Sequence, residues 1–225
     1  MKLTKRLLPP IATLAACVML TACLHTPSPQ SNQMYHAPAQ AFSLDLGSQA
    51  FRGQVTLRDS CTPEGSSVDI VDNDGRFFRV DAVNLINNPN VELPEFADDP
   101  TVRDLVLRYY TDQVNTGGRI LERANVNSRM GPALYSLLEL PNSNGSQYLG
   151  LLIARRGNFA YVLQHLQKTH RPNNMRTILG LLASETQIPG RLPANENQSD
   201  TPIYIDLKNS TPEQIEEWKK IARCT

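Results

Sequence analysis

The chain has 225 residues, and its 22 basic residues equal its 22 acidic ones. This length fits one domain with a sizeable core, and the balanced charge argues against nucleic acid as a general partner. Lys2, Lys5 and Arg6 precede an apolar stretch that ends at Leu20. A basic start before a short apolar run is typical of a secretory signal peptide. The uninterrupted run 11–20 is too short to span a bilayer, which takes about 20 apolar residues.

The apolar stretch leads into Leu20-Thr21-Ala22-Cys23. In this position the tetrapeptide resembles the lipobox of bacterial lipoproteins. The resemblance implies that residues 1–22 are a signal peptide and that Cys23, carrying acyl chains such as palmitate, begins the mature protein. A plain secretory signal cut after Ala22 and a retained transmembrane anchor are the alternatives. Without the three basic residues of the signal, the mature chain is mildly acidic.

Leu24 follows the cysteine. In lipoproteins of Gram-negative bacteria an Asp at this position usually means retention in the inner membrane. Its absence implies, for a Gram-negative source, a protein of the cell envelope anchored in the outer membrane and facing the periplasm. Two or more acyl chains hold a protein stably on a bilayer, so we expect the membrane to be a partner through the lipid anchor.

Two other cysteines belong to the mature chain, Cys61 and Cys224. An even pair in an oxidising compartment predicts a disulfide. Because it would close a loop of most of the domain, the chain-entropy model gives it up to ~5 kcal/mol of stabilisation. A redox-active pair would need a close spacing such as Cys-x-x-Cys, which the sequence lacks.

Residues 23–40 are rich in Pro, Ser and Gln and show no hydrophobic periodicity. We expect a flexible tether there and a single domain over 41–225. Alternating apolar residues predict strands around 42–46 and 55–61. Asp72-Asn73-Asp74-Gly75 lies between two further alternating runs and predicts a β-hairpin. The same residues partly mimic a calcium loop, but Ile70 occupies the first ligand position and the terminal Glu is missing, so we expect no metal site.

Asp99-Pro100 predicts a helix start with Asp99 as the cap, and Gly117-Gly118 predicts its end. Its apolar stripe is expected at Val102, Leu105, Val106, Tyr109 and Val114. Four apolar runs joined by tight turns then predict an antiparallel meander over 119–166. The run 148–154 should be central, because both of its faces are apolar.

A second helix is predicted after Pro172, and Ile203 and Ile205 predict a short edge strand. The buried stripe of the second helix is expected at Met175, Ile178, Leu179 and Leu182. The sequence Thr-Pro-Glu-Gln at 211–214 is a capping box that opens the last helix. Its apolar residues Ile215, Trp218 and Ala222 predict that this helix docks onto the domain.

These elements predict an α+β fold: an antiparallel sheet of about six strands with two to three helices packed on it, the C-terminal helix tied by the disulfide. The order hairpin, helix, meander, helix is similar to that of PsbP-like domains in envelope lipoproteins and photosynthetic proteins. The likeness covers about 65–190 and is carried by Gly131, the strand and turn Gly150–Gly157 and the strand of Tyr161. It implies a non-enzymatic binding or assembly role.

The sequence contains no Gly-x-Ser-x-Gly, Ser-x-x-Lys, His-Glu-x-x-His or phosphate-binding glycine motif. We therefore assign no catalytic residue and no cofactor. His165 lies on a predicted strand and is expected to face solvent or a ligand, and His170 follows near the next helix. A catalytic histidine would need a nucleophile that the sequence does not mark.

Arginines gather in the middle third of the chain: Arg119, Arg123, Arg129, Arg155, Arg156, Arg171 and Arg176. Arg155 and Arg156 fall at a predicted turn, and Arg171 and Arg176 fall near a predicted helix start. These four are a candidate anion-binding site for lipid phosphate, cell-wall carboxylates or an acidic partner. The alternative is a solvated face whose arginines pair with Glu122 and Glu139.

A well-patterned domain without a catalytic signature predicts a lipid-anchored, non-catalytic binding or assembly module with an envelope protein as its partner. Two other functions stay open. One is a carrier of an apolar or anionic small ligand in a cavity between sheet and helices. The other is a hydrolase with an unmarked active site, in which carboxylates converge with His165.

Overall fold

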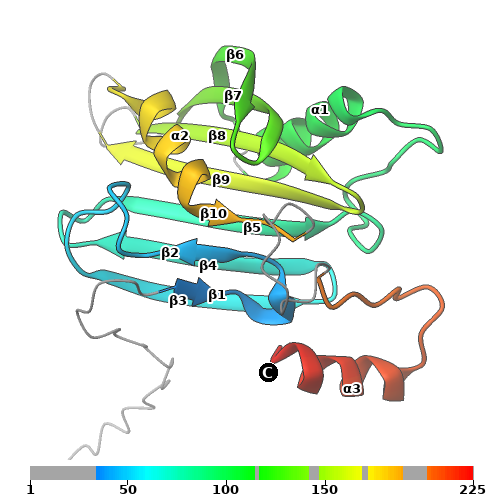
Figure 1. The fold of residues 1–225 in the computed structure, drawn as a ribbon. Helices are drawn as coiled ribbons and strands as arrows, with labels where there is room; N and C mark the ends of the chain where they lie inside the picture. The colour runs from blue at the N-terminus through cyan, green and yellow to red at the C-terminus, as the bar shows by residue number, and fades with distance from the viewer. Residues whose placement is uncertain (1–33, 115–116, 142–146, 169–171, 190–201, 225) are drawn as a thin grey trace, which may run out of the picture.

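The computed structural model describes residues 34–114, 117–141, 147–168, 172–189 and 202–224. Within these residues the chain forms two antiparallel sheets and three α-helices, which confirms the expected α+β class. The larger sheet has seven strands in the order β3-β4-β5-β9-β8-β7-β6, and the smaller has three in the order β1-β2-β10. The small sheet and α2 lie on one side of the large sheet (Figure 1).

The elements follow the chain in three groups. The first is β1 (Met34–His36), η1 (Pro38–Gln40), β2 (Ser43–Asp45), β3 (Val55–Thr62), β4 (Gly65–Asp72) and β5 (Phe77–Asn84). The second is α1 (Asp99–Tyr109), the π-helical turn η2 (Tyr110–Val114), β6 (Arg119–Ser128), β7 (Gly131–Leu140), β8 (Gln147–Arg156) and β9 (Phe159–Lys168). The third is α2 (Met175–Glu185), β10 (Thr186–Gln187) and α3 (Pro212–Ala222).

The predicted hairpin is formed by β4 and β5, and Asp72 organises its turn. The Asp72 carboxylate accepts hydrogen bonds from the backbone N–H groups of Arg52, Asp74 and Arg76 and from the Arg76 side chain. Burial disfavours the charge, but the hydrogen bonds from Arg76 and Arg52 outweigh it and lower the pKa of Asp72. This carboxylate therefore holds the turn together.

The predicted meander is also confirmed, because β6, β7, β8 and β9 pair consecutively and antiparallel. β8 lies inside the sheet, between β7 and β9. The long-range pairing of β5 with β9, with Phe78 opposite His165, joins hairpin and meander into one sheet. A register shift between Ile120 and Glu122 interrupts the pairing of the edge strand β6.

Two cores fill the two sides of the sheet. Alternation along β8 sends Leu152 and Ala154 to the core beneath α2 and the small sheet, and Leu151 and Ile153 to the core beneath α1. Gly150 brings α2 close to the strand, because a Cβ there would lie 2.9 Å from Leu179 Cδ1. The middle of β8 is therefore packed on both faces.

The first described strand begins at Met34, inside the segment 23–40 that was expected to be a tether. β1 pairs with β2, and the Tyr35 hydroxyl donates a hydrogen bond of 3.0 Å to Asp59 on β3. Ala37 and Ala39 are buried. The composition of the segment 23–40 is rich in Pro and Gln, but the small and aromatic side chains at its end pack on the domain.

Two local predictions need correction, the cap of α1 and the strand at 203–205. Asp98, not Asp99, caps α1, and it accepts a hydrogen bond of 2.9 Å from Thr101 N. Two adjacent aspartates fit the capping pattern equally well, so the pattern alone does not choose between them. The stripe expected on α1 is confirmed for Val102, Leu105, Val106 and Tyr109, which are buried or partly buried against one core, and Arg103 and Leu107 are buried beside them. The segment of Ile203 and Ile205 forms no strand, although Ile203 N donates to Ala39 O.

Candidate functional site

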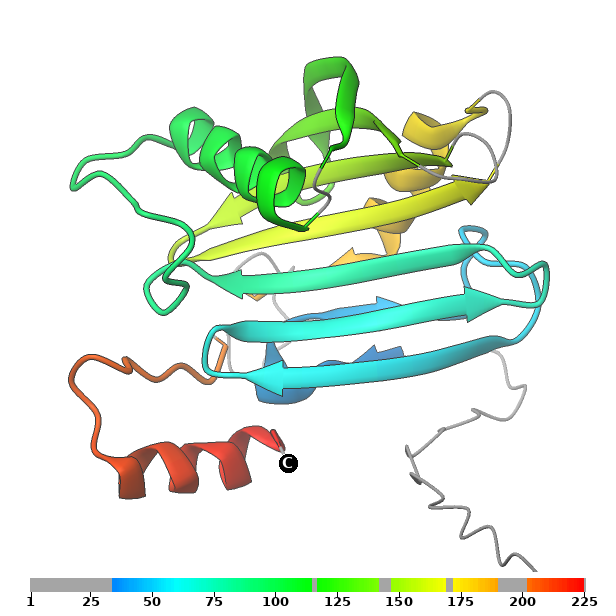
Figure 2. The same cartoon turned by 180° about the vertical axis from the view of Figure 1, so that it is seen from behind.

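One half of the large sheet has an uncovered side. In Figure 2 α1 lies over the upper strands, whereas no described helix or strand lies over β3, β4 and β5 on this side. Strand alternation turns polar side chains outward there and apolar ones such as Val68 and Ile70 inward to the core. We call this surface the open face. It consists of the polar residues Thr56, Arg58, Ser60, Thr62, Ser67, Asp69 and Arg79 and, at the end near the hairpin turn, of the apolar residues Val71 and Phe77.

The open face is ordered by contacts across its strands. Ser60 Oγ and Ser67 Oγ lie 2.7 Å apart in a hydrogen bond. Arg79 bridges two carboxylates, with its Nη1 3.1 Å from Asp69 Oδ1 and its Nε 2.7 Å from Asp81 Oδ1. The polar groups are therefore held in fixed rows along the paired strands.

A cleft of about 200 Å³ opens where the open face meets the end of α1. Its lining includes hydroxyl, carboxylate and amide side chains: Ser60, Thr62, Glu64, Asn88, Tyr109 and Tyr110. The Glu64 carboxylate is half-buried and makes no hydrogen bond or ion pair with the described residues. The Glu64 carboxylate can therefore accept a hydrogen bond from a molecule bound in the cleft.

Asp81 forms the buried wall of the cleft. It accepts hydrogen bonds from the Tyr110 hydroxyl at 2.7 Å, from Arg79 Nε at 2.7 Å and from Gln164 Nε2 at 2.5 Å. Burial raises the pKa of Asp81, although Arg79 and the other donors oppose the shift. Burial and the Asp81 carboxylate together also raise the pKa of Tyr110. Asp81 is fully engaged in joining β5, β9 and η2.

His165 does not face solvent or a ligand, contrary to the expectation. Its side chain is buried and stacks on Phe78 with the ring centroids 4.5 Å apart. Its Nδ1 lies 2.9 Å from Phe77 O. Burial lowers the pKa of His165. It lies on the side of the sheet opposite Asp81, because Leu163 and Phe78 place it in the other core. Asp72 raises the pKa of His165 in opposition to burial, but its carboxylate is engaged by the hairpin turn and the Arg76 side chain.

The structure places three of the four arginines of the candidate anion site, and it separates Arg155 from Arg156. Strand alternation turns Arg155 and Arg156 to opposite faces of the sheet. Arg155 donates to Ala97 O at 2.9 Å and pairs with Asp99 at 3.3 Å, whereas Arg156 Nε is buried without a hydrogen-bond partner. Arg171 lies outside the described residues.

Arg176 lies on α2, 5.8 Å above the ring centroid of Tyr135. Tyr135 pairs with Leu152, which is about 13 Å along β8 from Arg156 at the usual rise of a strand. Elsewhere in the arginine-rich third, Arg119 pairs with Glu139 at 2.6 Å and Arg123 pairs with Asp104. The pair of Arg119 with Glu139 is one that the alternative predicted, whereas Arg123 pairs with Asp104 and not with Glu122.

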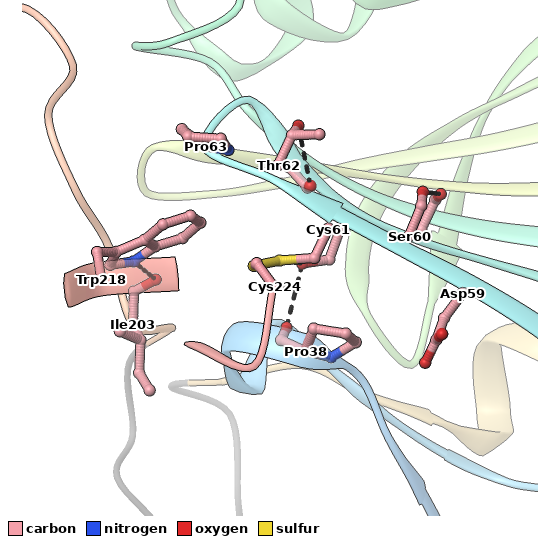
Figure 3. The surroundings of a disulfide bond; sticks show 12 residues. Pro38, Asp59, Ser60, Cys61, Thr62, Pro63, Ile203, Trp218 and Cys224 are labelled. Carbon is pink, nitrogen blue, oxygen red and sulfur yellow. Dashed lines mark hydrogen bonds between the residues drawn. A yellow bond between two sulfur atoms is a disulfide. The ribbon is translucent and has the colours of Figure 1, made fainter. Parts of the chain in front are cut away.

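The predicted disulfide joins Cys61 of β3 to Cys224 just after α3, with their Cα atoms 4.8 Å apart (Figure 3). Trp218 Nε1 donates to Ile203 O at 3.3 Å. The side-chain amide of Asn87 donates both to Pro63 O at 2.8 Å and to Ile205 O at 2.7 Å. The C-terminal segment is thus fixed beside β3 and η1, close to the end of the open face.

Among the described residues, no group of three or more His, Cys, Asp or Glu side chains is arranged to hold a metal ion. None of the described helices combines the length and the apolar character needed to cross a membrane.

No family model matches the chain, and no curated protein matches it. A solved structure from Bacteroides thetaiotaomicron is similar over 76% of this chain and 52% of its own, at 10% sequence identity and a TM-score of 0.42. This chain therefore spans about half the length of that structure.

Proposed function

We propose that this protein is a lipid-anchored module of the cell envelope that binds a protein partner and performs no catalysis. The lipobox-like sequence ending at Cys23 supports the anchor. The observation that carries the binding role is the open face. The inner side of β3, β4 and β5 is packed beneath the small sheet, whereas their outer side carries fixed polar rows beside a cleft.

The polar composition of the open face favours a transient association over a permanent one. Interfaces of this kind are about as polar as the rest of the protein surface, whereas permanent ones resemble a core cut in half. The ion pairs of Arg79 and the bond between Ser60 and Ser67 hold donors and acceptors in place before binding. Such preorganisation lowers the entropy cost of association.

The position of Met34, the first described residue, is compatible with a binding module anchored through its N-terminal segment. Met34 begins β1, which lies on the side of the large sheet opposite the open face (Figure 1). The residues between Cys23 and Met34 span at most about 40 Å when extended. A domain held at this distance can turn the open face away from the lipid surface.

The polar cleft gives some support to the carrier alternative, for a small polar ligand. Its lining by Glu64, Asn88 and Tyr109 suits hydrogen-bonding groups more than an apolar molecule. The volume of about 200 Å³ is below the range of ~300–1,000 Å³ of drug-sized ligand pockets. The cleft is therefore suited to one side chain of a partner or to a small polar molecule.

Two measurements test the proposal. Intact-mass analysis of the mature N-terminus should find acyl chains on Cys23, and Cys23→Ser should abolish them. Crosslinking in intact cells, followed by mass spectrometry, should recover a specific envelope protein with the native chain but not with Cys23→Ser. An unacylated Cys23 would refute the anchor. Recovery of no protein partner, with a small molecule co-purifying instead, would replace the binding module by the carrier.

A further inference from the structure

Phe96 is the most exposed large apolar side chain described, at 90%. It lies in the loop between β5 and α1. We call residues 91–99 the acidic loop, because Glu92, Glu95, Asp98 and Asp99 belong to it. Single apolar side chains on a surface are common and need no explanation. The packing of this loop and its charge set Phe96 apart.

The acidic loop is fixed on the domain. Val91 is buried, and Leu93 and Ala97 pack against the core beneath α1. Ala97 N donates to Pro94 O at 3.1 Å, and Arg155 donates to Ala97 O at 2.9 Å. Leu93 and Ala97 therefore fix the loop before and after Phe96, while the Phe96 side chain is exposed. A ring presented on a fixed backbone loses little freedom on binding.

The charges around Phe96 are only partly neutralised. Asp98 caps α1 and Asp99 pairs with Arg155. The carboxylates of Glu92 and Glu95 are exposed and make no hydrogen bond or ion pair with the described residues. Anionic lipid headgroups attract basic segments and repel acidic ones, so the loop is poorly suited to insert Phe96 into a bilayer. A protein pocket with a basic rim fits both features.

We propose that Phe96 enters an apolar pocket on the protein partner and that Glu92 and Glu95 pair with Lys or Arg side chains at its rim. The inference rests on the proposed function and specifies the chemistry of the partner. Aromatic anchors in such pockets provide much of the binding energy, and rim charges set the association rate and its salt dependence. Asn88, just before the loop, lines the cleft, so the contact adjoins the open face.

The test places a photoreactive phenylalanine analogue at position 96 of the full-length chain in its native cells. Ile221 on α3, which is 60% exposed, receives the same analogue as the matched control. Position 96 should give a discrete protein adduct that position 221 does not give. The linked peptide of the partner should carry Lys or Arg next to apolar residues. Glu92→Gln with Glu95→Gln should lower the yield severalfold.

The purified partner then allows an affinity measurement. Phe96→Ala should weaken binding about thirtyfold or more, as expected for a hot spot, whereas Ile221→Ala should leave it unchanged. Adducts with lipid or with a second copy of this chain would overturn the inference. So would an adduct peptide without basic residues, an unchanged yield in the charge variant, or no adduct at position 96. If position 96 gives none while the analogue at Ser60 on the open face still captures a partner, only this inference fails and the proposed function stands.

Discussion

Tyr110, at the end of α1, donates a hydrogen bond of 2.7 Å to Asp81, which is buried in the middle of β5. The bond ties a helix that covers one half of the sheet to a strand of the uncovered half. The same carboxylate accepts from Arg79 on the open face. The position of α1, the wall of the cleft and the rows of the open face therefore depend on one buried acid.

Removing the Tyr110 hydroxyl should destabilise the fold measurably. Tyr110→Phe leaves Asp81 with one donor fewer in a buried site, which typically costs ~1–3 kcal/mol. Denaturant unfolding measures the loss. Tyr109→Phe is the matched control, because the half-buried Tyr109 makes no hydroxyl hydrogen bond with described residues, and it should change stability by less than about 0.5 kcal/mol. Equal losses in both variants would contradict the role given to Tyr110.

Asp81 should give the stability a specific pH dependence. Burial raises its pKa in the folded state, so the folded chain holds the proton more tightly than the unfolded chain. Its contribution is then complete below the unfolded pKa of about 3.9 and is lost as the pH rises through the folded pKa. The free energy of unfolding of the native chain, relative to Asp81→Asn, should fall as the pH rises above about 4. A relative rise over that range would contradict this assignment.

Asp72 should behave with the opposite sign. Hydrogen bonds from Arg76 and Arg52 lower its pKa despite burial. Its contribution is therefore present above the unfolded pKa and lost as the pH falls through the lower folded value. Urea titrations of Asp72→Asn should differ from the native chain most at neutral pH and least in strong acid. A difference that grows on acidification would show that the turn does not depend on the charged form.

Two glycines near α2 should respond in opposite directions to the same substitution. Gly150→Ala places a Cβ 2.9 Å from Leu179 Cδ1 and 3.2 Å from Met175 Cε, and overpacking of this kind costs ~1–3 kcal/mol. Gly180→Ala meets nothing within 4 Å on an exposed helix position and should stabilise by ~0.5–1 kcal/mol. Thermal unfolding separates the two. Stabilisation by Gly150→Ala would mean that α2 is not seated closely on β8.

The disulfide should hold the C-terminal segment as well as stabilise the fold. Cys61→Ser with Cys224→Ser should lower stability by several kcal/mol, with ~5 kcal/mol as the chain-entropy limit. Amide exchange should speed up most in α3, whose other contacts include the Trp218 bond to Ile203 O. Unchanged exchange in α3 would show that its packing alone keeps it in place.

Much of the fold could be predicted because its signals are local. The turn at 72–75, the capping box at 211–214 and the tight turns of the meander each lie within a few residues. The face to which His165 points could not be predicted. Its neighbours Val162, Leu163 and Leu166 put apolar side chains on both faces of β9. The hydrophobic pattern of this strand therefore does not show which face is exposed.

The candidate site depends on contacts that no local pattern encodes. Asp81 alternates with Val80 and Ala82 and resembles a solvent-facing residue. Its partners Tyr110 and Gln164 are 29 and 83 residues away. Arg155 and Arg156 are separated because adjacent residues of a strand always point to opposite faces. The sequence predicts a turn at these two residues, whereas β8 extends through Arg156, so the split became visible only in the structure.

The most direct test of the binding role blocks the open face in cells. Ser60→Trp places a bulky side chain on the exposed part of β3, and Asn125→Trp places the same side chain on exposed β6 across the sheet. With both variants lipidated and folded, crosslinking to the envelope partner should be lost in Ser60→Trp and retained in Asn125→Trp. Retention in Ser60→Trp would contradict the account, because the partner would then bind elsewhere on the protein.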